Sequence, residues 1–161
     1  MKRSEFWVLS NRADRELLPL VDRHYSRKTP GAPQFVSPGR CLVLKTPVNN
    51  AVWVTSWPYR QYTHHDWAGA WVCSIFRNES PHLSSEMIRS AIGITRWKWP
   101  LVPDEGMITF VNRKKVRPKK NPGYCFEMAG FSHVGYTKSG LITLHLGAGM
   151  PEPEMPMDVL F

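Results

Sequence analysis

Three short apolar runs followed by one amphipathic segment limit the fold of this chain more than any other feature. The runs cover residues 41–44, 51–54 and 70–76, and each has the length of a strand. A short gap containing Asn49-Asn50 indicates that the first two runs form a hairpin. In residues 83–97 the apolar side chains recur at helical spacing, so we expect a helix with one buried face.

Shorter elements are expected around this centre, in the order strand, helix, loop, three strands, helix, strand, helix and two strands. Ser84 is expected to cap the central helix. Residues 1–150 are therefore predicted to form a single α/β domain, with a mixed, largely antiparallel central sheet flanked by helices. Residues 151–161, rich in Pro and Glu, are expected to be an extended or loose tail. The flanking elements are expected at 6–9, 12–25, 106–111, 122–129, 131–135 and 141–146, with a loop at 26–40.

The charge of the chain points to a polyanionic partner. Among its 161 residues, 21 Lys and Arg stand against 13 Asp and Glu, which gives a net charge of +8. Such a balance favours association with nucleic acid or with a phosphorylated cofactor, although charge that serves only solubility fits equally well. A hydrophobic share of 42% excludes a disordered chain.

The cysteines and the apolar segments bear on the cellular compartment. Cys41, Cys73 and Cys125 form no CxxC pair, so neither a zinc knuckle nor a disulfide framework is predicted. We find no signal-peptide pattern and no apolar run long enough to span a membrane. We therefore expect a soluble protein that does not bind membranes. We expect it in the cytoplasm, which would be the host cytoplasm if a phage encodes it.

A local pattern near the end of the chain resembles a known superfamily. Residues 121–135 read Asn-Pro-Gly-Tyr-Cys-Phe-Glu-Met-Ala-Gly-Phe-Ser-His-Val-Gly. This segment resembles the last helix and turn of GNAT acyltransferases, and residues 43–146 can be laid on the family pattern. The resemblance implies a GNAT-like catalytic domain, an acyl-CoA-type donor, and a role for Tyr124 as the acid that protonates the leaving thiolate.

The donor site of the family lies between a central strand and the following helix. Here residues 77–85 read Arg-Asn-Glu-Ser-Pro-His-Leu-Ser-Ser, without the glycines that are usual in the family. Polar residues between a buried strand and a helix start are typical of ligand sites. We therefore predict that Glu79 or His24 is the catalytic base, and we predict cofactor-binding roles for Arg77, Asn78, Ser84 and Ser85. Capping and solvation of the helix start are the alternative.

A narrower resemblance concerns residues 22–30, Asp-Arg-His-Tyr-Ser-Arg-Lys-Thr-Pro. They resemble the Mom group, phage-associated enzymes that convert DNA adenine to a carbamoylmethyl form and so protect the DNA from restriction. The resemblance implies that His24 and Tyr25 are catalytic. It also suggests that these two residues are ligands of an iron ion. Residue type alone also fits a histidine at a helix end beside a core tyrosine.

Two further segments have the composition of a DNA contact. Six of the eight residues in 113–120 are basic, and each cation that neutralises a phosphate adds salt-dependent affinity; a solvated loop is the alternative. Residues 57–67 mix aromatic, basic and His residues, which suits stacking on a base flipped out of the duplex, or an ordinary loop. The predicted DNA-binding residues are Arg27, Lys28, Arg113, Lys114, Lys115, Arg117, Lys119 and Lys120.

Together these patterns predict a transferase that modifies a base in double-stranded DNA, with a small-molecule donor and a second copy of the chain as a further partner. A conventional acetyl-CoA-dependent N-acetyltransferase is one alternative. A non-catalytic nucleic-acid-binding module on a GNAT scaffold is the other. The first hypothesis requires that residues 24–25, residues 77–79 and Tyr124 converge, with the extruded base entering near His24, Tyr25 and the 57–67 loop.

Overall fold

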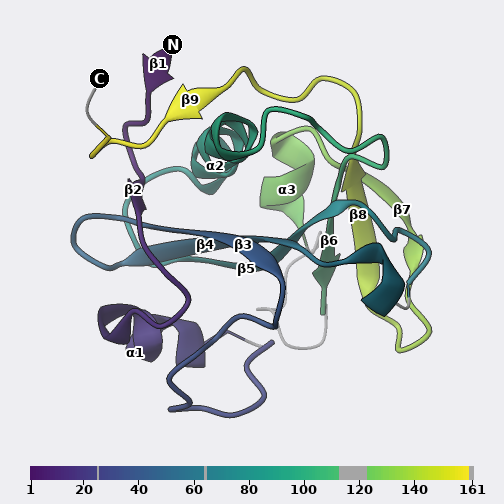
Figure 1. Cartoon of the computed structure of the whole chain (residues 1–161), viewed down its shortest axis with the longest axis horizontal. Coiled ribbons are helices and arrows are strands. Elements are labelled where there is room, and N and C mark those ends of the chain that lie inside the picture. The colour runs from purple at the N-terminus through teal and green to yellow at the C-terminus, as the bar shows by residue number, and fades with distance from the viewer. Residues whose placement is uncertain (25, 64, 113–122, 160–161) are drawn as a thin grey trace.

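The computed structural model describes residues 1–24, 26–63, 65–112 and 123–159 (Figure 1). These residues form a seven-stranded sheet in the order β2-β3-β4-β5-β6-β8-β7. Only β5 and β6 are parallel neighbours within it. The expectation of a mixed, largely antiparallel α/β fold is therefore confirmed. The strands are β2 (Val8–Leu9), β3 (Arg40–Lys45), β4 (Ala51–Trp57), β5 (Trp71–Asn78), β6 (Met107–Val111), β7 (Ser132–Tyr136) and β8 (Ile142–Leu146).

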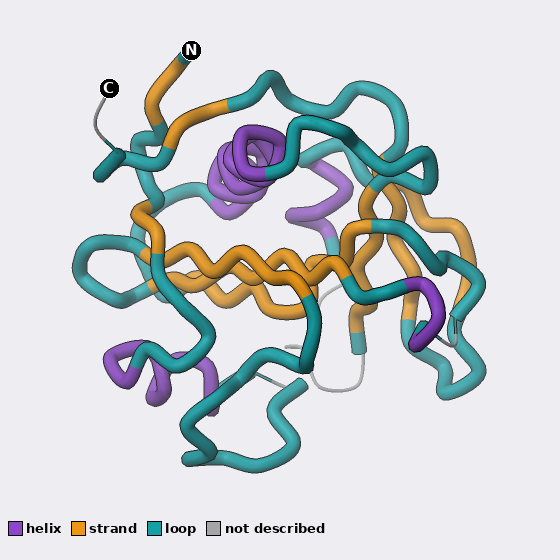
Figure 2. Tube along the Cα trace, in the orientation of Figure 1, coloured by secondary structure: helices purple, strands orange, loops and turns teal. Residues whose placement is uncertain are grey.

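Helices cover both faces of the sheet (Figures 1 and 2). Helices α2 (Ser84–Lys98) and α3 (Tyr124–Met128) lie on one side, here called the α2 face. The short α1 (Leu18–Asp22), preceded by the 3-10 turn η1 (Arg15–Leu17), lies on the other, the α1 face. A second 3-10 turn, η2 (Arg60–Tyr62), follows β4. Each face has its own apolar cluster, because side chains alternate along a strand.

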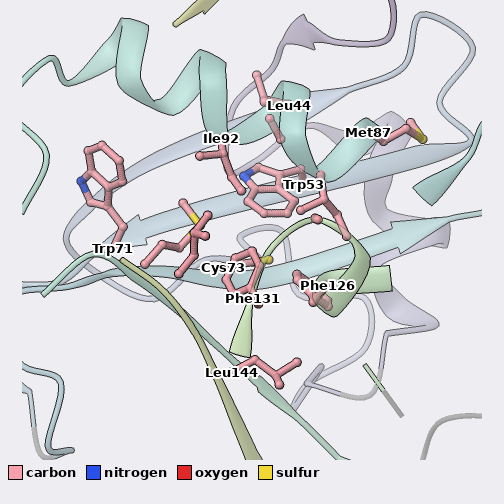
Figure 3. Packing of buried hydrophobic residues seen from close by; sticks show 14 of the residues in the cluster. Leu44, Trp53, Trp71, Cys73, Met87, Ile92, Phe126, Phe131 and Leu144 are labelled. Atoms are coloured by element: carbon pink, nitrogen blue, oxygen red, sulfur yellow. The ribbon is translucent and has the colours of Figure 1, made fainter. Parts of the chain in front are cut away.

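Strand β4 shows how the two clusters divide. Val52 and Val54 pack with α1, whereas Ala51 and Trp53 pack with α2 and α3. Figure 3 shows Trp53 in one cluster with Ile92 of α2 and Phe126 of α3. The buried apolar side chains predicted from the runs 41–44 and 51–54 therefore fill two cores, one on each face.

Strand β5 contains a bulge that changes this alternation. The register shifts between Val54–Ile75 and Thr55–Cys73, which leaves Ser74 as an additional residue. Cys73 consequently belongs to the cluster on the α2 face and Ile75 to the cluster on the α1 face, although they are two residues apart. A bulge has this effect because it inserts one residue into an otherwise regular ladder.

The parallel strands β5 and β6 pair over only a short distance. Their register covers Trp71–Met107, Val72–Ile108 and Cys73–Thr109, and it includes no described residue beyond Cys73. The carboxyl ends of both strands lie at the same edge because the strands are parallel. The hydroxyl of Thr109 donates to the Cys73 carbonyl (2.9 Å) at the last paired position.

The end of the chain differs from the loose tail expected for 151–161. Strand β9 (Glu154–Met155) pairs in parallel with β1 (Lys2–Arg3), and Met155 is buried. Arg96 of α2 donates to the Pro151 carbonyl (2.6 Å). A Cβ at Gly93 of α2 would lie 2.7 Å from the Glu152 carbonyl oxygen, so the absence of a side chain there allows the close approach of this segment.

The first helix is shorter than predicted, and the N-cap of α2 lies one residue before the predicted one. Asp14 caps η1 by accepting from the Glu16 N–H, and the helix proper starts only beside Pro19, which has no N–H to donate. It ends at Asp22, far short of residue 25. Ser84 is the first residue of α2 rather than its cap, because the cap position is Leu83. No helix of the described residues has both the length and the apolar character required to cross a lipid bilayer.

Candidate functional site

A cluster of charged side chains joins the end of β5 to the turn after α1. Glu79 accepts hydrogen bonds from Arg23 Nη2 (2.8 Å), Arg23 Nε (2.9 Å) and Arg77 Nε (2.6 Å). Arg77 Nη1 also donates to the Arg23 carbonyl (3.1 Å). The bonds from Arg23 and then Arg77 lower the pKa of Glu79 to about 2. Glu79 is therefore a weaker proton acceptor than an ordinary carboxylate, and it fixes both guanidinium groups in place.

His24 lies beside this cluster with only 8% of its surface exposed. Burial, and secondly the charge of Arg77, lower its pKa to about 4, so the ring is neutral at neutral pH. Its Nδ1 accepts from the Ser26 N–H (3.1 Å) and lies 2.7 Å from the Ser26 hydroxyl. These contacts place the ring proton on Nε2.

Ser26 is the residue that the sequence reasoning missed. Its side chain is exposed, whereas the His24 ring to which it is bonded is buried. A substrate at the surface would therefore meet the serine hydroxyl before the imidazole. A hydroxyl hydrogen-bonded to an unprotonated imidazole nitrogen is the arrangement in which serine can pass on a proton. The position of Ser26 directly after the predicted His24-Tyr25 pair is the sequence feature that could have identified it.

Asn78 faces the other side of the sheet from Arg77. Its amide nitrogen donates to the His82 carbonyl and to the Ser84 hydroxyl, both at 2.9 Å. Its amide oxygen accepts from the Ser80 N–H (2.9 Å). The side chain thus shapes the turn that leads into α2, in place of the missing glycines. Arg77 and Asn78, predicted as one set of cofactor ligands, are divided between the two faces.

The start of α2 keeps features of an anion site. Leu83, at the cap position, contributes no side-chain hydrogen bond to the first turn. Ser84 and Ser85 are partly buried at this start, and Ser84 is already bonded to Asn78. Exposed N–H groups at a helix start attract phosphate and carboxylate groups. The exposed Glu86 in the same first turn opposes such binding.

The remaining predicted residues are divided among several places. Tyr124 is exposed at the start of α3, and none of the contacts described above links it to His24, Arg77 or Glu79. Arg27 is committed to its own loop: its Nε donates to Asp22 (2.7 Å), and its side chain is only 7% exposed. It is therefore poorly placed for a DNA phosphate. Lys28 is exposed.

Tyr25 and the basic run 113–120 lie outside the described residues, so their predicted roles stay predictions. The described positions on either side of the run lie close together. A Cβ at Gly123 would lie 3.6 Å from Cγ2 of Val111, the last residue of β6. Val111 and Gly123 therefore lie side by side at the edge of the sheet where β5 also ends.

The 57–67 loop was predicted to lie near His24, but its first residue, Trp57, lies at the other end of the β4–β5 pair. Trp57 lies near Trp71, at the start of β5, whereas Val52 pairs with Arg77 near its end. The later part of the loop returns along the α1 face, where His65 contacts Phe110 of β6 (ring centroids 5.4 Å apart). This later part therefore contacts β6, whereas Trp57 packs at the start of β5.

The described residues contain no group of three His, Cys, Asp or Glu side chains that could hold a metal ion. The predicted iron site therefore has no support beyond His24 among these residues, and Tyr25 is not one of them.

Comparison of this chain with protein-family models, with curated proteins and with solved structures found no match.

Proposed function

We propose that this chain is a GNAT-like transferase that adds an acyl-type group to the exocyclic amine of a DNA base. Adenine is the proposed base through the resemblance of residues 22–30 to the Mom group. The observation that carries the proposal is the hydrogen-bonded pair of a buried neutral His24 and an exposed Ser26, held beside Arg77 and Glu79. Among the described residues it is the arrangement best suited to moving a proton.

The architecture supports the GNAT likeness. The crossovers through α2 and α3 follow the element order on which the resemblance rests. The single parallel pair separates after Cys73 and Thr109, and the start of α2 follows the carboxyl end of β5. Ligands of open α/β sheets bind outside the carboxyl ends of the strands. The His24–Ser26 pair lies at this edge, through the contacts of Arg77 with Arg23 and Glu79.

The donor is proposed to bind at the start of α2. The N–H groups of Ser84 and Ser85 would hold its phosphate, because a helix start carries a partial positive charge. The donor supplies an electrophilic carbon and a leaving group. Asn78 keeps the preceding turn closed and so limits the shape of the donor that fits.

The proposed proton path begins at the base. As its exocyclic nitrogen bonds to the donor carbon, the nitrogen becomes positively charged and strongly acidic, so a weak base suffices to deprotonate it. The Ser26 hydroxyl takes this proton and passes its own to His24 Nδ1. The bond from the carbon to the leaving group breaks, and Tyr124 is the proposed donor of a proton to that group.

Charge supports DNA as the partner. The chain carries a net charge of +8, and six of its basic residues occur in the sequence between Val111 and Gly123. Long-range attraction of this kind concentrates a polyanion at the site. The exposed Lys28 lies two residues after Ser26.

The test is mass spectrometry of nucleosides from the DNA of cells that express the chain. We expect a modified adenosine with the native chain and at least a hundredfold less with His24→Ala, in line with the loss of a proton-transfer group. Ser26→Ala should lose most of the product, and Ser26→Thr, which keeps a hydroxyl, should retain part of it. His133→Ala, an exposed histidine of β7, is the matched control.

Three results would contradict the proposal. An unmodified nucleoside profile with the native chain, together with salt-sensitive DNA binding, would favour a non-catalytic module. Acetylation of a small amine with no change in DNA would favour a conventional N-acetyltransferase. Full modification by folded His24→Ala and Ser26→Ala variants would remove the proposed proton path.

A further inference from the structure

A pocket of about 480 Å³ lies at the opposite end of the β4–β5 pair from Arg77. One part of its lining is apolar and the other is charged. Val52, the β4 partner of Arg77, is five residues from Trp57, which corresponds to about 17 Å along a strand. The pocket is thus a separate place from the His24–Ser26 pair. It is lined by Arg40, Trp57, Pro58, Arg60, Gly69, Leu101, Val102, Pro103, Asp104 and Glu105.

Arg40 forms a flat cationic surface in this pocket. Its guanidinium carbon lies 4.0 Å from the centre of the Trp57 ring and 5.3 Å from that of Tyr59. Stacking holds a guanidinium group by its face and leaves its N–H edges available, a geometry suited to phosphate or to the edge of a base. No ion pair of Arg40 occurs within the described part of the chain.

Arg60 has a different role. It is paired with Glu105 across Gly69. A Cβ at Gly69 would collide with the Arg60 guanidinium and lie 2.9 Å from Glu105 Oε1. The glycine therefore allows the ion pair to form one side of the pocket. With Arg60 neutralised by Glu105, Arg40 is the pocket cation that remains for a ligand anion.

The other side of the pocket combines an apolar surface with a carboxylate. Leu101 is 84% exposed, and it adjoins Val102 and Pro103. Asp104 follows directly, and among the described residues its side chain has no ion pair. An apolar surface can pack against the face of a base, and a carboxylate can accept from the exocyclic amine of cytosine or adenine.

We propose that this pocket binds one nucleotide of the DNA at a distance from the base that reacts. Its base packs against Leu101 and Pro58, its exocyclic amine donates to Asp104, and its phosphate bonds to the Arg40 edge. The inference rests on the proposed function, because it takes DNA as the substrate. The pocket would add a contact, separate from the reacting groups, that makes the protein prefer particular DNA bases near the modified one.

The first test measures binding of a labelled DNA duplex by fluorescence anisotropy. Arg40→Ala should weaken binding about five- to thirtyfold, the loss expected when one phosphate contact and its stacked geometry are removed. Arg40→Lys should recover only part, since an ammonium group keeps the charge without the planar edge. Lys138→Ala, which removes one exposed charge from the β7–β8 turn, should change binding less than about twofold.

Equal effects of Arg40→Ala and Lys138→Ala would overturn the proposal, because Arg40 would then contribute only general charge. Titration with free dAMP, followed by tryptophan fluorescence, separates a DNA site from a site for a free nucleotide. Binding of dAMP that depends on Arg40, without any Arg40 effect on DNA, would overturn the assignment to DNA. The nucleoside assay keeps the two proposals apart: modification with no Arg40 effect removes the pocket proposal alone.

Discussion

The two ends of the β4–β5 pair are held by different forces. At the Arg77 end, one carboxylate bonds to two exposed guanidinium groups beside a buried neutral histidine. At the Trp57 end, three tryptophans pack together, with ring centroids 5.3–6.2 Å apart. Hydrogen bonds and charges fix directions but respond to pH and salt, whereas aromatic burial is largely insensitive to both. The first end should therefore respond to pH and salt, whereas the second should depend on packing alone.

The largest effect is expected from Trp71→Ala at the aromatic end. Trp71 is fully buried between Trp57 and Trp99, so its removal should lower the free energy of unfolding by about 3–5 kcal/mol. Urea titration measures this loss. It should be the same at pH 7 and pH 5.5; a loss below about 1 kcal/mol, or one confined to acid, would show that burial is not what holds this end.

The next effect concerns the pH dependence of the charged end. The unfolded chain binds a proton at His24 near the ordinary pKa of 6.5, whereas the folded chain does so only at about 4. Stability should therefore be constant above pH 6.5 and fall as the pH drops toward 4, by at most about 3 kcal/mol from this group.

His24→Gln should remove that part of the pH dependence in a urea titration series, while His133→Gln should keep it. An unchanged pH profile in His24→Gln would mean that His24 is not held neutral by the fold.

A smaller change is expected from Glu79→Gln. Because the ion pairs with Arg23 and Arg77 are largely exposed, the loss should be about 1 kcal/mol or less and should shrink further at high salt. Unfolding measured at low salt and at about 1 M salt provides the test. A loss that does not respond to salt would contradict an electrostatic role for this cluster.

The smallest effect is expected from Arg40→Met at the aromatic end. The variant removes the cation stacked on Trp57 and keeps a long apolar side chain, so the loss should be about 0.5 kcal/mol. Thermal unfolding monitored by circular dichroism measures it. A loss that exceeds that of Glu79→Gln would reverse the order proposed for the two ends.

Sequence reasoning identified the centre of the fold because apolar runs and helical stripes report burial directly. The hairpin of β3 and β4, the strand β5 and the amphipathic α2 all lie where these patterns predicted them. It overestimated the first helix because the apolar spacing extends from before Pro19, beside which the helix starts, to beyond Asp22, where it ends. The order of β7 and β8 in the sheet depends on long-range pairing that no local pattern contains.

The candidate site was predictable in part. The proximity of His24, Arg77 and Glu79 was expected and is observed through the contacts of Arg23 and Arg77. The role of Asn78 in shaping its turn was not expected, because the facing of a strand residue depends on the exact register. Composition likewise could not show that Arg27 is occupied by Asp22 and by carbonyl groups of its own loop.

The bulge at Ser74 decides which side of the sheet carries the reactive groups. With a regular strand, Arg77 would point toward α2 and Asn78 toward α1. Loss of the bulge with Ser74 retained would exchange these two side chains, separating Glu79 from one guanidinium group and opening the turn before α2. Deletion of Ser74 would instead leave Cys73 opposite Thr55 and Ile75 opposite Val54 in a regular ladder, with Arg77 and Asn78 on their present faces. The alternation of side chains along one strand thus controls both halves of the proposed chemistry, so one residue inserted between Ile75 and Arg77 would be more harmful than deletion of Ser74 itself.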